Sequence, residues 1–436
     1  MLLLLYLLVC VSSFGLISLA PLFGLSTPVG IFNGNDILLL ALLVLSVPAY
    51  LRQRRKLASP RWRRMELIWV VFIVFLAVQA FRSPASSLTE RFVNVRSIQG
   101  YLLFFPSIAV LVSQQRLRKI AVAGLVFALV GTVLTIAQGL HGLDNLFDSP
   151  FYDIGSWGGN KDFVGELARV NLPISSWVAF VLLVLVAMIL LRFRPWQILI
   201  GAFLAITILI NFSRSLWLAM LAACAVMVIL VLATGHVRRT SLLRLVVLVI
   251  ILLAGLRIAS FIGLSGLSSA ISQRVAEGVY DVTRLAGNWA GRLEQQKAAM
   301  ALWQSNPWLG IGTDYYSTFG NWIDLGLPLV LVSVGIVGLV IDFALFFGCF
   351  LTGILVLRQG IKKDSVPLLV VGAVLPAQVV LMLVYQQWLD PRGFAILGFV
   401  SALAVVSPGI FRDSGKAEVA LSSGIVRFGQ KTFRHV

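Results

Sequence analysis

The sequence predicts an all-α polytopic membrane protein with about 12 transmembrane helices. Hydrophobic residues make up 59% of the 436 residues and charged residues only 12%, against roughly 45–50% and 25% in a soluble domain. Spans of about 20 residues, twelve in all, would use roughly 55% of the chain, which nearly matches the hydrophobic share. Apolar runs separated by polar or Gly/Pro-rich breaks fall at 2–20, 36–51, 66–82, 97–113, 119–138, 174–191, 197–211, 215–235, 244–263, 325–348, 365–386 and 394–411.

The basic residues fall in alternate connections between these runs. Most of the 35 Lys and Arg residues follow this alternation, from the Arg52–Arg64 connection to the segment after Phe411. By the positive-inside rule this face is cytoplasmic and both termini lie there. The net charge of +17 is therefore explained by topology, and a nucleic-acid partner is not expected. The first run, 2–20, lacks a basic n-region and a cleavage site, so we expect it to be retained as a span.

Cysteine, histidine and glycine patterns argue against several site types. Cys10, Cys224 and Cys349 lie far apart in apolar stretches, and the three histidines have no metal-ligand spacing. A GxxxxGK[ST] motif does not occur in the sequence. We expect no disulfide framework, no metal site and no cofactor.

Two external connections are long, at 141–173 and 264–323. Within the second, Ser269–Arg284 and Arg292–Gln304 have helix-forming composition, and Asn306-Pro307 ends the second helix. We expect two short helices over the membrane surface, like a lid. The expected divisions are helices 1–9 in residues 1–263, the extracytoplasmic lid loop 264–323, helices 10–12 in 324–411 and a basic cytoplasmic tail 412–436.

Two ionisable residues fall inside apolar runs. Arg257 and Asp342 are functional candidates by default, because a charge in the hydrocarbon region is costly. The alternative is a structural pair, or a side chain that reaches the interface. Two such residues are few for a proton-coupled transporter.

Four motifs occur in order on or beside the external face: GNKDFVGELARVNLP at 159–173, NFSRSLW at 211–217, GRLEQQKAAMALWQSNPWLGIGTDYY at 291–316 and GIVGL at 335–339. In sequence, spacing and topology they resemble the superfamily of O-antigen ligases and O-antigen or exopolysaccharide polymerases. The resemblance implies a GT-C-like helical architecture in the bacterial inner membrane. It also implies metal-independent transfer of a glycan from a polyprenyl-diphosphate donor, such as undecaprenyl diphosphate, to a hydroxyl of an acceptor glycan or glycolipid.

The motifs carry residues that suit this reaction. Arg214 lies in a short turn between two spans, and Arg292 begins the second lid helix. A guanidinium group binds a diphosphate bidentately, although an interfacial anchor or a solvated helix face would also explain either residue. Asp324 stands where ligases have a His, so it is a catalytic candidate or a helix N-cap. Weaker substrate-binding candidates, each with a structural alternative as a turn residue, anchor or interfacial aromatic, are Asn160, Arg169, Arg96 and Tyr315.

We interpret the sequence as a glycosyltransferase that polymerises O-antigen or exopolysaccharide repeat units. Asp324 in place of the ligase His favours a polymerase over an O-antigen ligase that acts on lipid A-core. A secondary transporter with twelve spans is the alternative from another class. The few buried charges, the lack of a visible internal repeat and the motif in the external loop argue against transport. A lipid-glycan flippase would place its cations at mid-depth, whereas these arginines lie at the edge.

Overall fold

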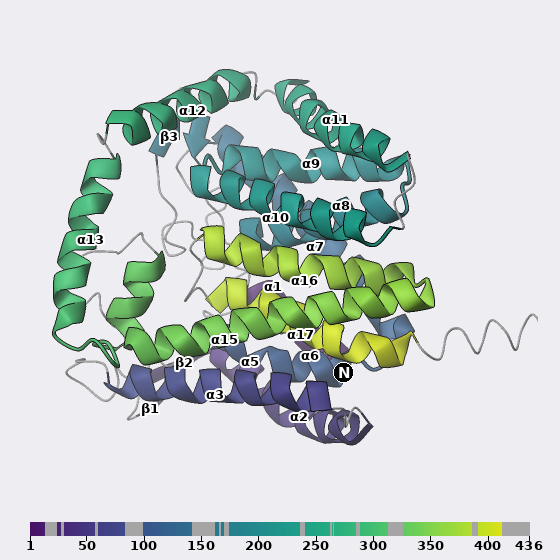
Figure 1. The fold of residues 1–436 in the computed structure, drawn as a ribbon, viewed down its shortest axis with the longest axis vertical. Helices are drawn as coiled ribbons and strands as arrows, with labels where there is room; N and C mark the ends of the chain where they lie inside the picture. The colour runs from purple at the N-terminus through teal and green to yellow at the C-terminus, as the bar shows by residue number, and fades with distance from the viewer. Residues whose placement is uncertain are drawn as a thin grey trace, which may run out of the picture.

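The computed structural model describes residues 1–13, 24–27, 30–56, 60–82, 99–141, 162–164, 167–169, 174–235, 240–261, 264, 266–284, 288–312, 326–385 and 391–411. Most of these residues lie in long helices that run side by side (Figure 1). Their bounds are α1 (Leu2–Ser13), α2 (Gly34–Lys56), α3 (Pro60–Arg82), α5 (Gln99–Leu102), α6 (Phe104–Val110), α7 (Gln114–His141), α8 (Ile174–Leu191), α9 (Trp196–Ile210), α10 (Arg214–Ala233), α11 (Thr240–Phe261), α12 (Leu267–Arg284), α13 (Asn288–Gln304), α15 (Gly326–Lys363), α16 (Val366–Tyr385) and α17 (Pro391–Ile410).

The multi-pass helical class is confirmed. Within the described residues, 8 helices are long and apolar enough to cross a membrane: α2, α3, α7, α8, α10, α15, α16 and α17. Each apolar run predicted from the sequence overlaps at least one helix. The count of twelve spans stays a prediction.

The structure departs from the expected elements in three places. The run at 97–113 is divided into α5 and α6, with Leu103 between them. The end predicted at residue 348 is wrong, because α15 continues through further apolar residues to Lys363. Two short antiparallel hairpins accompany the helices: β1 (Gly24–Thr27) pairs with β2 (Gly30–Asn33), and β3 (Asp162–Val164) with β4 (Leu167–Arg169).

Small residues allow α15 and α16 to pack closely. A Cβ atom added at Gly353 would lie 2.4 Å from Cδ of Pro376, and one at Gly372 would lie 2.4 Å from the backbone nitrogen of Leu357. These contacts leave no room for a side chain at either glycine. Close backbone approach of this kind is typical of helix pairs in membranes, where burial of apolar side chains gives little driving force.

An aromatic cluster joins α3, α6 and α17. The rings of Trp69 and Phe104 stack with centroids 5.0 Å apart, and those of Phe72 and Phe394 do the same at 5.0 Å. All four side chains are buried. The cluster fixes α3 against α6 and α17.

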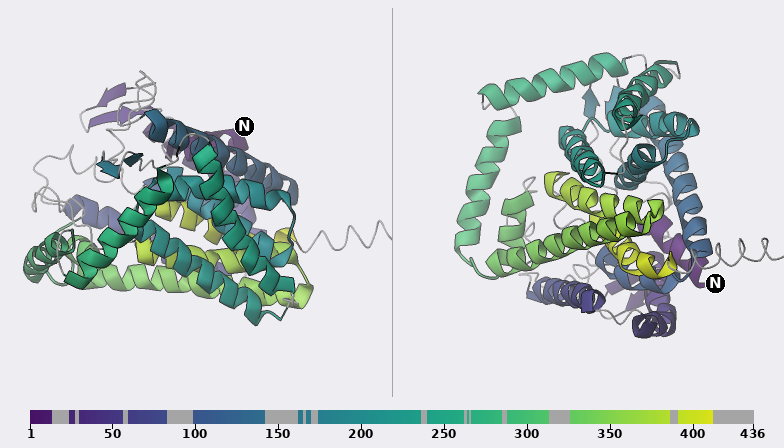
Figure 2. Two further views of the ribbon diagram at one scale, coloured as in Figure 1. Left: turned by 90° about the horizontal axis from the view of Figure 1, so that it is seen from above. Right: turned by 45° about the vertical axis from the view of Figure 1, so that its right-hand side comes forward.

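The helices α12 and α13 lie outside the packed spans (Figures 1 and 2). They cover the edge where α3 and α9 end and where α10 and α15 begin, and α13 runs across the direction of α15. The helices expected at 269–284 and 292–304 are therefore present, each beginning a few residues earlier. We call α12 and α13 the lid helices.

Candidate functional site

The turn between α9 and α10 places a cation at a helix N-terminus. Phe212 is buried with φ +50°, and Ser213 caps α10 by accepting a hydrogen bond from the backbone N–H of Leu216 at 3.4 Å. Arg214 is then the first residue of α10. The helix dipole already makes this end positive, so an arginine here is unfavourable for the helix by about 0.3–1 kcal/mol. The same placement strengthens the attraction for an anion.

Buried polar contacts hold the turn rigid. Asn211 is buried and donates from Nδ2 to Oγ of Ser175 on α8 at 3.2 Å. Trp217 donates from Nε1 to the carbonyl of Ile208 at 2.8 Å, across the two helices that the turn joins. A non-glycine residue with positive φ costs about 1–3 kcal/mol and persists only when its surroundings hold it. These contacts supply that support for Phe212.

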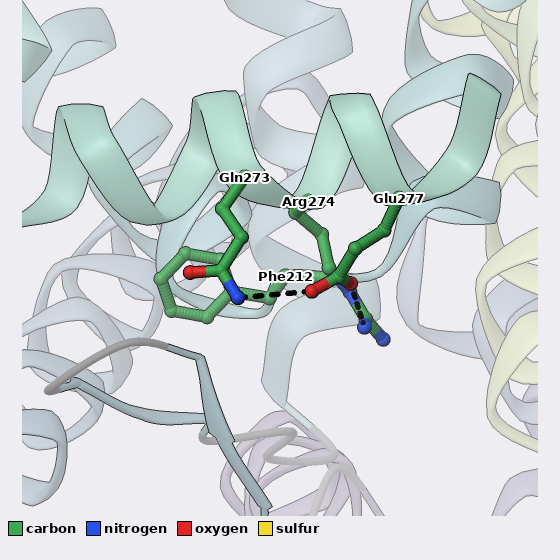
Figure 3. Close-up of polar contacts among 4 residues, drawn as sticks. All are labelled: Phe212, Gln273, Arg274 and Glu277. Atoms are coloured by element: carbon green, nitrogen blue, oxygen red, sulfur yellow. Dashed lines mark hydrogen bonds and ion pairs between the residues drawn. The ribbon is translucent and has the colours of Figure 1, made fainter. Parts of the chain in front are cut away.

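The lid helix α12 covers the turn with a charged group that the sequence motifs did not single out. Arg274 donates from Nε to the backbone carbonyl of Phe212 at 3.4 Å (Figure 3). Its Nη1 pairs with Oε2 of Glu277 at 2.8 Å, and Gln273 donates to the other carboxylate oxygen at 3.0 Å. The predicted helix at 269–284 contained Arg274, but nothing in the sequence pointed to its acceptor.

Arg214 and Arg292 lie on the same covered edge of the protein. Arg214 is partly buried on α10, beneath α12, whereas Arg292 is partly exposed on α13. The lid brings both arginines to one side of the spans.

The segment 307–312, which follows α13, inserts into a break in α15. The helix breaks at Gly335, which has φ +66° and ψ −167°. In an unbroken helix the N–H groups of Ile336 and Val337 would donate to the carbonyls four residues earlier. Here they donate to the inserted segment instead: Ile336 N–H to Pro307 O and Val337 N–H to Trp308 O, each at 3.0 Å. The carbonyls of Val332 and Ser333 in turn accept from the inserted segment, from Ile311 N–H at 2.8 Å and Gly312 N–H at 3.0 Å. We call this set of four hydrogen bonds the clasp.

Two glycines make the clasp possible. A Cβ atom at Gly335 would lie 2.4 Å from the carbonyl oxygen of Trp308, and one at Gly310 would lie 2.6 Å from that of Val332. Gly310 and Gly312 have φ of +65° and +108°, a backbone region that glycine adopts without strain. The NPWLGIG and GIVGL motifs, which are separate in the sequence, therefore form one backbone-paired unit.

The clasp connects α13 to the spans. Ala299 of α13 packs on Val332, and Trp303 donates from Nε1 to the carbonyl of Pro307 at 3.0 Å. From the other side, Arg82 at the end of α3 donates from Nη1 to Oε1 of Gln79 at 3.1 Å. Its second contact, to the carbonyl of Leu309, is longer at 3.5 Å. Sequence reasoning did not single out Arg82, which looked like any other basic residue at the end of a span.

A comparison with known proteins identifies this region. Residues 199–343 match the family model described as O-antigen ligase. This segment is similar to the O-antigen ligase family. The match confirms the resemblance to the O-antigen ligase and polymerase superfamily that the motifs indicated. No curated protein matches the chain.

The O-antigen ligase segment contains the complete turn, both lid helices and the clasp. Arg214, Arg292 and Asp324 all fall within it, whereas the GNKDFVGELARVNLP motif precedes it. The match therefore covers the turn, the lid helices and the clasp, whereas Arg82 and Ser175 lie outside it. Asn160, Arg169 and Arg96 lie in parts of the sequence that the match does not reach.

Five predicted site residues have no described side-chain position. Asn160, Arg96, Tyr315 and Asp324 lie outside the described residues. Arg169 is described only by its backbone, which pairs with Asp162 in the second hairpin. Their roles stay predictions.

The two ionisable residues in the apolar runs lie in different surroundings. Asp342 on α15 is buried, and neither carboxylate oxygen has a hydrogen-bond partner among the described residues. Arg257 on α11 is exposed. A structural pair between them is therefore not seen in the described part of the chain. Among the described residues, no three His, Cys, Asp or Glu side chains lie close enough together to hold a metal ion.

Proposed function

We propose that the protein transfers a glycan from a polyprenyl-diphosphate donor to an acceptor hydroxyl at the extracytoplasmic face of the bacterial inner membrane. The reaction that we favour is polymerisation of O-antigen or exopolysaccharide repeat units. The observation that carries this proposal is the O-antigen ligase match over residues 199–343. The matched segment includes the turn at residues 211–214, which we call the Arg214 turn, and the lid helices above it. Glycosyltransferase-like chemistry of the ligase and polymerase kind follows from that family, and the substrates named here are our inference.

The Arg214 turn has the properties of a diphosphate site. The leaving diphosphate is anionic, and a guanidinium group at a helix N-terminus attracts it through both charges. Each contact between arginine and phosphate contributes about 1.5–3 kcal/mol, and more where water is partly excluded. Arg214 is covered by α12, which removes part of that water. In our proposal Arg292 approaches the same diphosphate from α13.

The reaction requires one bond to form and one to break. The acceptor hydroxyl oxygen bonds to the anomeric carbon, and the bond from that carbon to the diphosphate oxygen breaks. The diphosphate leaves with the electron pair, and the arginines stabilise its charge. The hydroxyl proton passes to a base or to water. We assign Asp324 to orient this hydroxyl or to accept its proton, and we propose that no metal takes part.

The choice of polymerase over ligase rests on the residue type at the acceptor side. No His occurs between His236 and His435, and Asp324 occupies the position before the next span. The match to the O-antigen ligase family agrees with either activity, so transfer to lipid A-core is the second candidate. We further propose twelve spans in a GT-C-like arrangement, with the lid helices outside and both termini inside.

Arginine-to-lysine variants test the proposal. Lysine keeps the charge but loses the planar fork, so Arg214→Lys and Arg292→Lys should each strongly reduce polymer synthesis in cells that lack the wild-type gene. Surface polysaccharide on a gel should then show single-repeat intermediates, whereas a ligase defect would leave lipid A-core uncapped. Expression is checked by immunoblot of the membranes. If both Lys variants make polymer at the wild-type level, diphosphate recognition by these residues is wrong.

A further inference from the structure

The lid helix α12 meets the Arg214 turn at two points that lie one helical turn apart. At the first, Arg274 donates to the carbonyl of Phe212 at 3.4 Å. At the second, Gly278 faces the side chain of Arg214. Positions i and i+4 share one face of a helix, so the same face of α12 makes both contacts.

Gly278 leaves just enough room for Arg214. A Cβ atom at position 278 would lie 3.0 Å from both Cδ and Nη1 of Arg214 and 3.7 Å from its Cζ. Carbon atoms prefer separations of about 3.5–4.0 Å, so the arginine side chain would have to move by a few tenths of an ångström. Nη1 is already buried in this arrangement. The bare backbone of α12 at Gly278 therefore forms one wall of the space that the guanidinium group occupies.

The Arg274 contact holds α12 in register over the turn that carries Arg214. Arg274 is 17% exposed, and its charge is balanced by Glu277 at 2.8 Å. Gln273 donates to the same carboxylate at 3.0 Å (Figure 3). The carboxylate of Glu277 neutralises the charge of Arg274, which lowers the attraction of this guanidinium group for a phosphate. Arg274 thus holds α12 in place, and Arg214 is the cation that we assign to the substrate.

We propose that Gly278 is a positioning residue, which lets α12 lie close enough to the turn to set the place of the Arg214 guanidinium group for a lipid diphosphate. This inference rests on the proposed function and adds a structural role for the lid. The lid is then part of the binding site as well as its cover. Its closeness to the turn depends on the absence of a side chain at position 278.

Alanine at position 278 separates this role from general helix stability. Gly278 lies inside α12, where alanine favours the helix by about 1 kcal/mol relative to glycine. A loss of function in Gly278→Ala therefore cannot come from a weaker helix. The matched control is Gly266→Ala, just before the same helix, because a Cβ atom there would meet nothing within 4 Å.

Binding of undecaprenyl diphosphate to the purified full chain in lipid nanodiscs is the direct measurement. This probe carries no sugar, so its use does not depend on the identity of the glycan. We expect Gly278→Ala to weaken binding about tenfold, since misplacement by about 1 Å costs up to about a hundredfold in well-ordered sites. Gly266→Ala should bind as the wild type does. Thermal unfolding of Gly278→Ala should occur at or above the wild-type temperature.

A double-mutant cycle with Arg214→Lys shows whether Gly278 acts through Arg214. Lysine keeps the Cδ contact but lacks Nη1 and the planar guanidinium group that is to be positioned, so Gly278→Ala should have a smaller effect on the Arg214→Lys background than on the wild type. Equal losses on the two backgrounds would mean a general packing defect and would overturn the inference. Unchanged binding in Gly278→Ala would overturn it as well.

The same measurements distinguish failure of this inference from failure of the proposed function. If the wild type binds the probe and Arg214→Lys weakens binding while Gly278→Ala does not, only the positioning role is wrong. If the wild type does not bind the probe, or if Arg214→Lys binds as the wild type does, the diphosphate site itself is wrong. The role of Gly278 then falls with it.

Discussion

Replacing Gly335 by alanine should open the clasp between α13 and α15. The backbone of Gly335, with φ +66° and ψ −167°, lies in a region that is essentially open only to glycine. Holding alanine there costs about 1–3 kcal/mol before any contact is considered. The new Cβ would also lie 2.4 Å from the carbonyl oxygen of Trp308 and 2.5 Å from the nitrogen of Gly310. Both neighbours are backbone atoms, which cannot rotate away.

The four hydrogen bonds of the clasp limit the size of the effect. Each contributes about 1 kcal/mol net, and a straightened α15 regains two of the four, so the remaining bonds favour the clasp by a sum of roughly 2 kcal/mol. When the cost of alanine approaches this sum, α15 straightens: Ile336 and Val337 then donate to Val332 and Ser333 as in an ordinary helix. The carbonyls of the 307–312 segment become exposed to water. We therefore expect a measurable destabilisation of the clasp of about 1–2 kcal/mol, with α15 itself intact.

Hydrogen–deuterium exchange of the purified protein measures this opening directly. The amides of Ile311 and Gly312 should exchange about fivefold to thirtyfold faster in Gly335→Ala, because they donate only in the closed clasp. Gly348→Ala, in the same helix, is the control, since its Cβ would meet only the ends of two flexible side chains, Ile68 at 3.2 Å and Met65 at 4.0 Å. Wild-type exchange at Ile311 and Gly312 in Gly335→Ala would refute the explanation that glycine is required at the break.

Three further changes test the remaining predictions. A single cysteine at Ser305 in a cysteine-free background should react with an impermeant reagent added outside spheroplasts, while one at Ser365 should be protected; the reverse pattern would invert the topology. Asp324→Asn should abolish polymer synthesis with normal expression if the carboxylate serves the acceptor hydroxyl, because asparagine caps a helix about as well as aspartate, and unimpaired synthesis would leave it a cap. Asp342→Asn should unfold at the same temperature as the wild type or higher, since it removes a buried carboxylate that has no partner among the described residues; a clear drop would show that the carboxylate is held by a partner.

The sequence alone was sufficient for the class of protein, the main helices and the family. Hydrophobic spans are long and continuous, so composition and periodicity identify them without any knowledge of their neighbours. The lid helices could be predicted as well, because Asn306-Pro307 marks the end of one of them. Arg214 and Arg292 were recognisable for another reason: each stands in a short motif whose letters are contiguous.

Only the tertiary structure related these motifs to one another. The clasp joins residues 307–312 to residues 332–337 through backbone groups, and every residue except proline carries the same donor and acceptor, so no letter of the sequence indicates the pairing. Arg274 likewise reaches a carbonyl 62 residues away, on Phe212, and its choice of acceptor leaves no pattern. Gly278 looks like a weak point in a helix when it is viewed alone. Its role depends on how closely α12 approaches Arg214, and that distance is set by the packing of helices that are far apart in the chain.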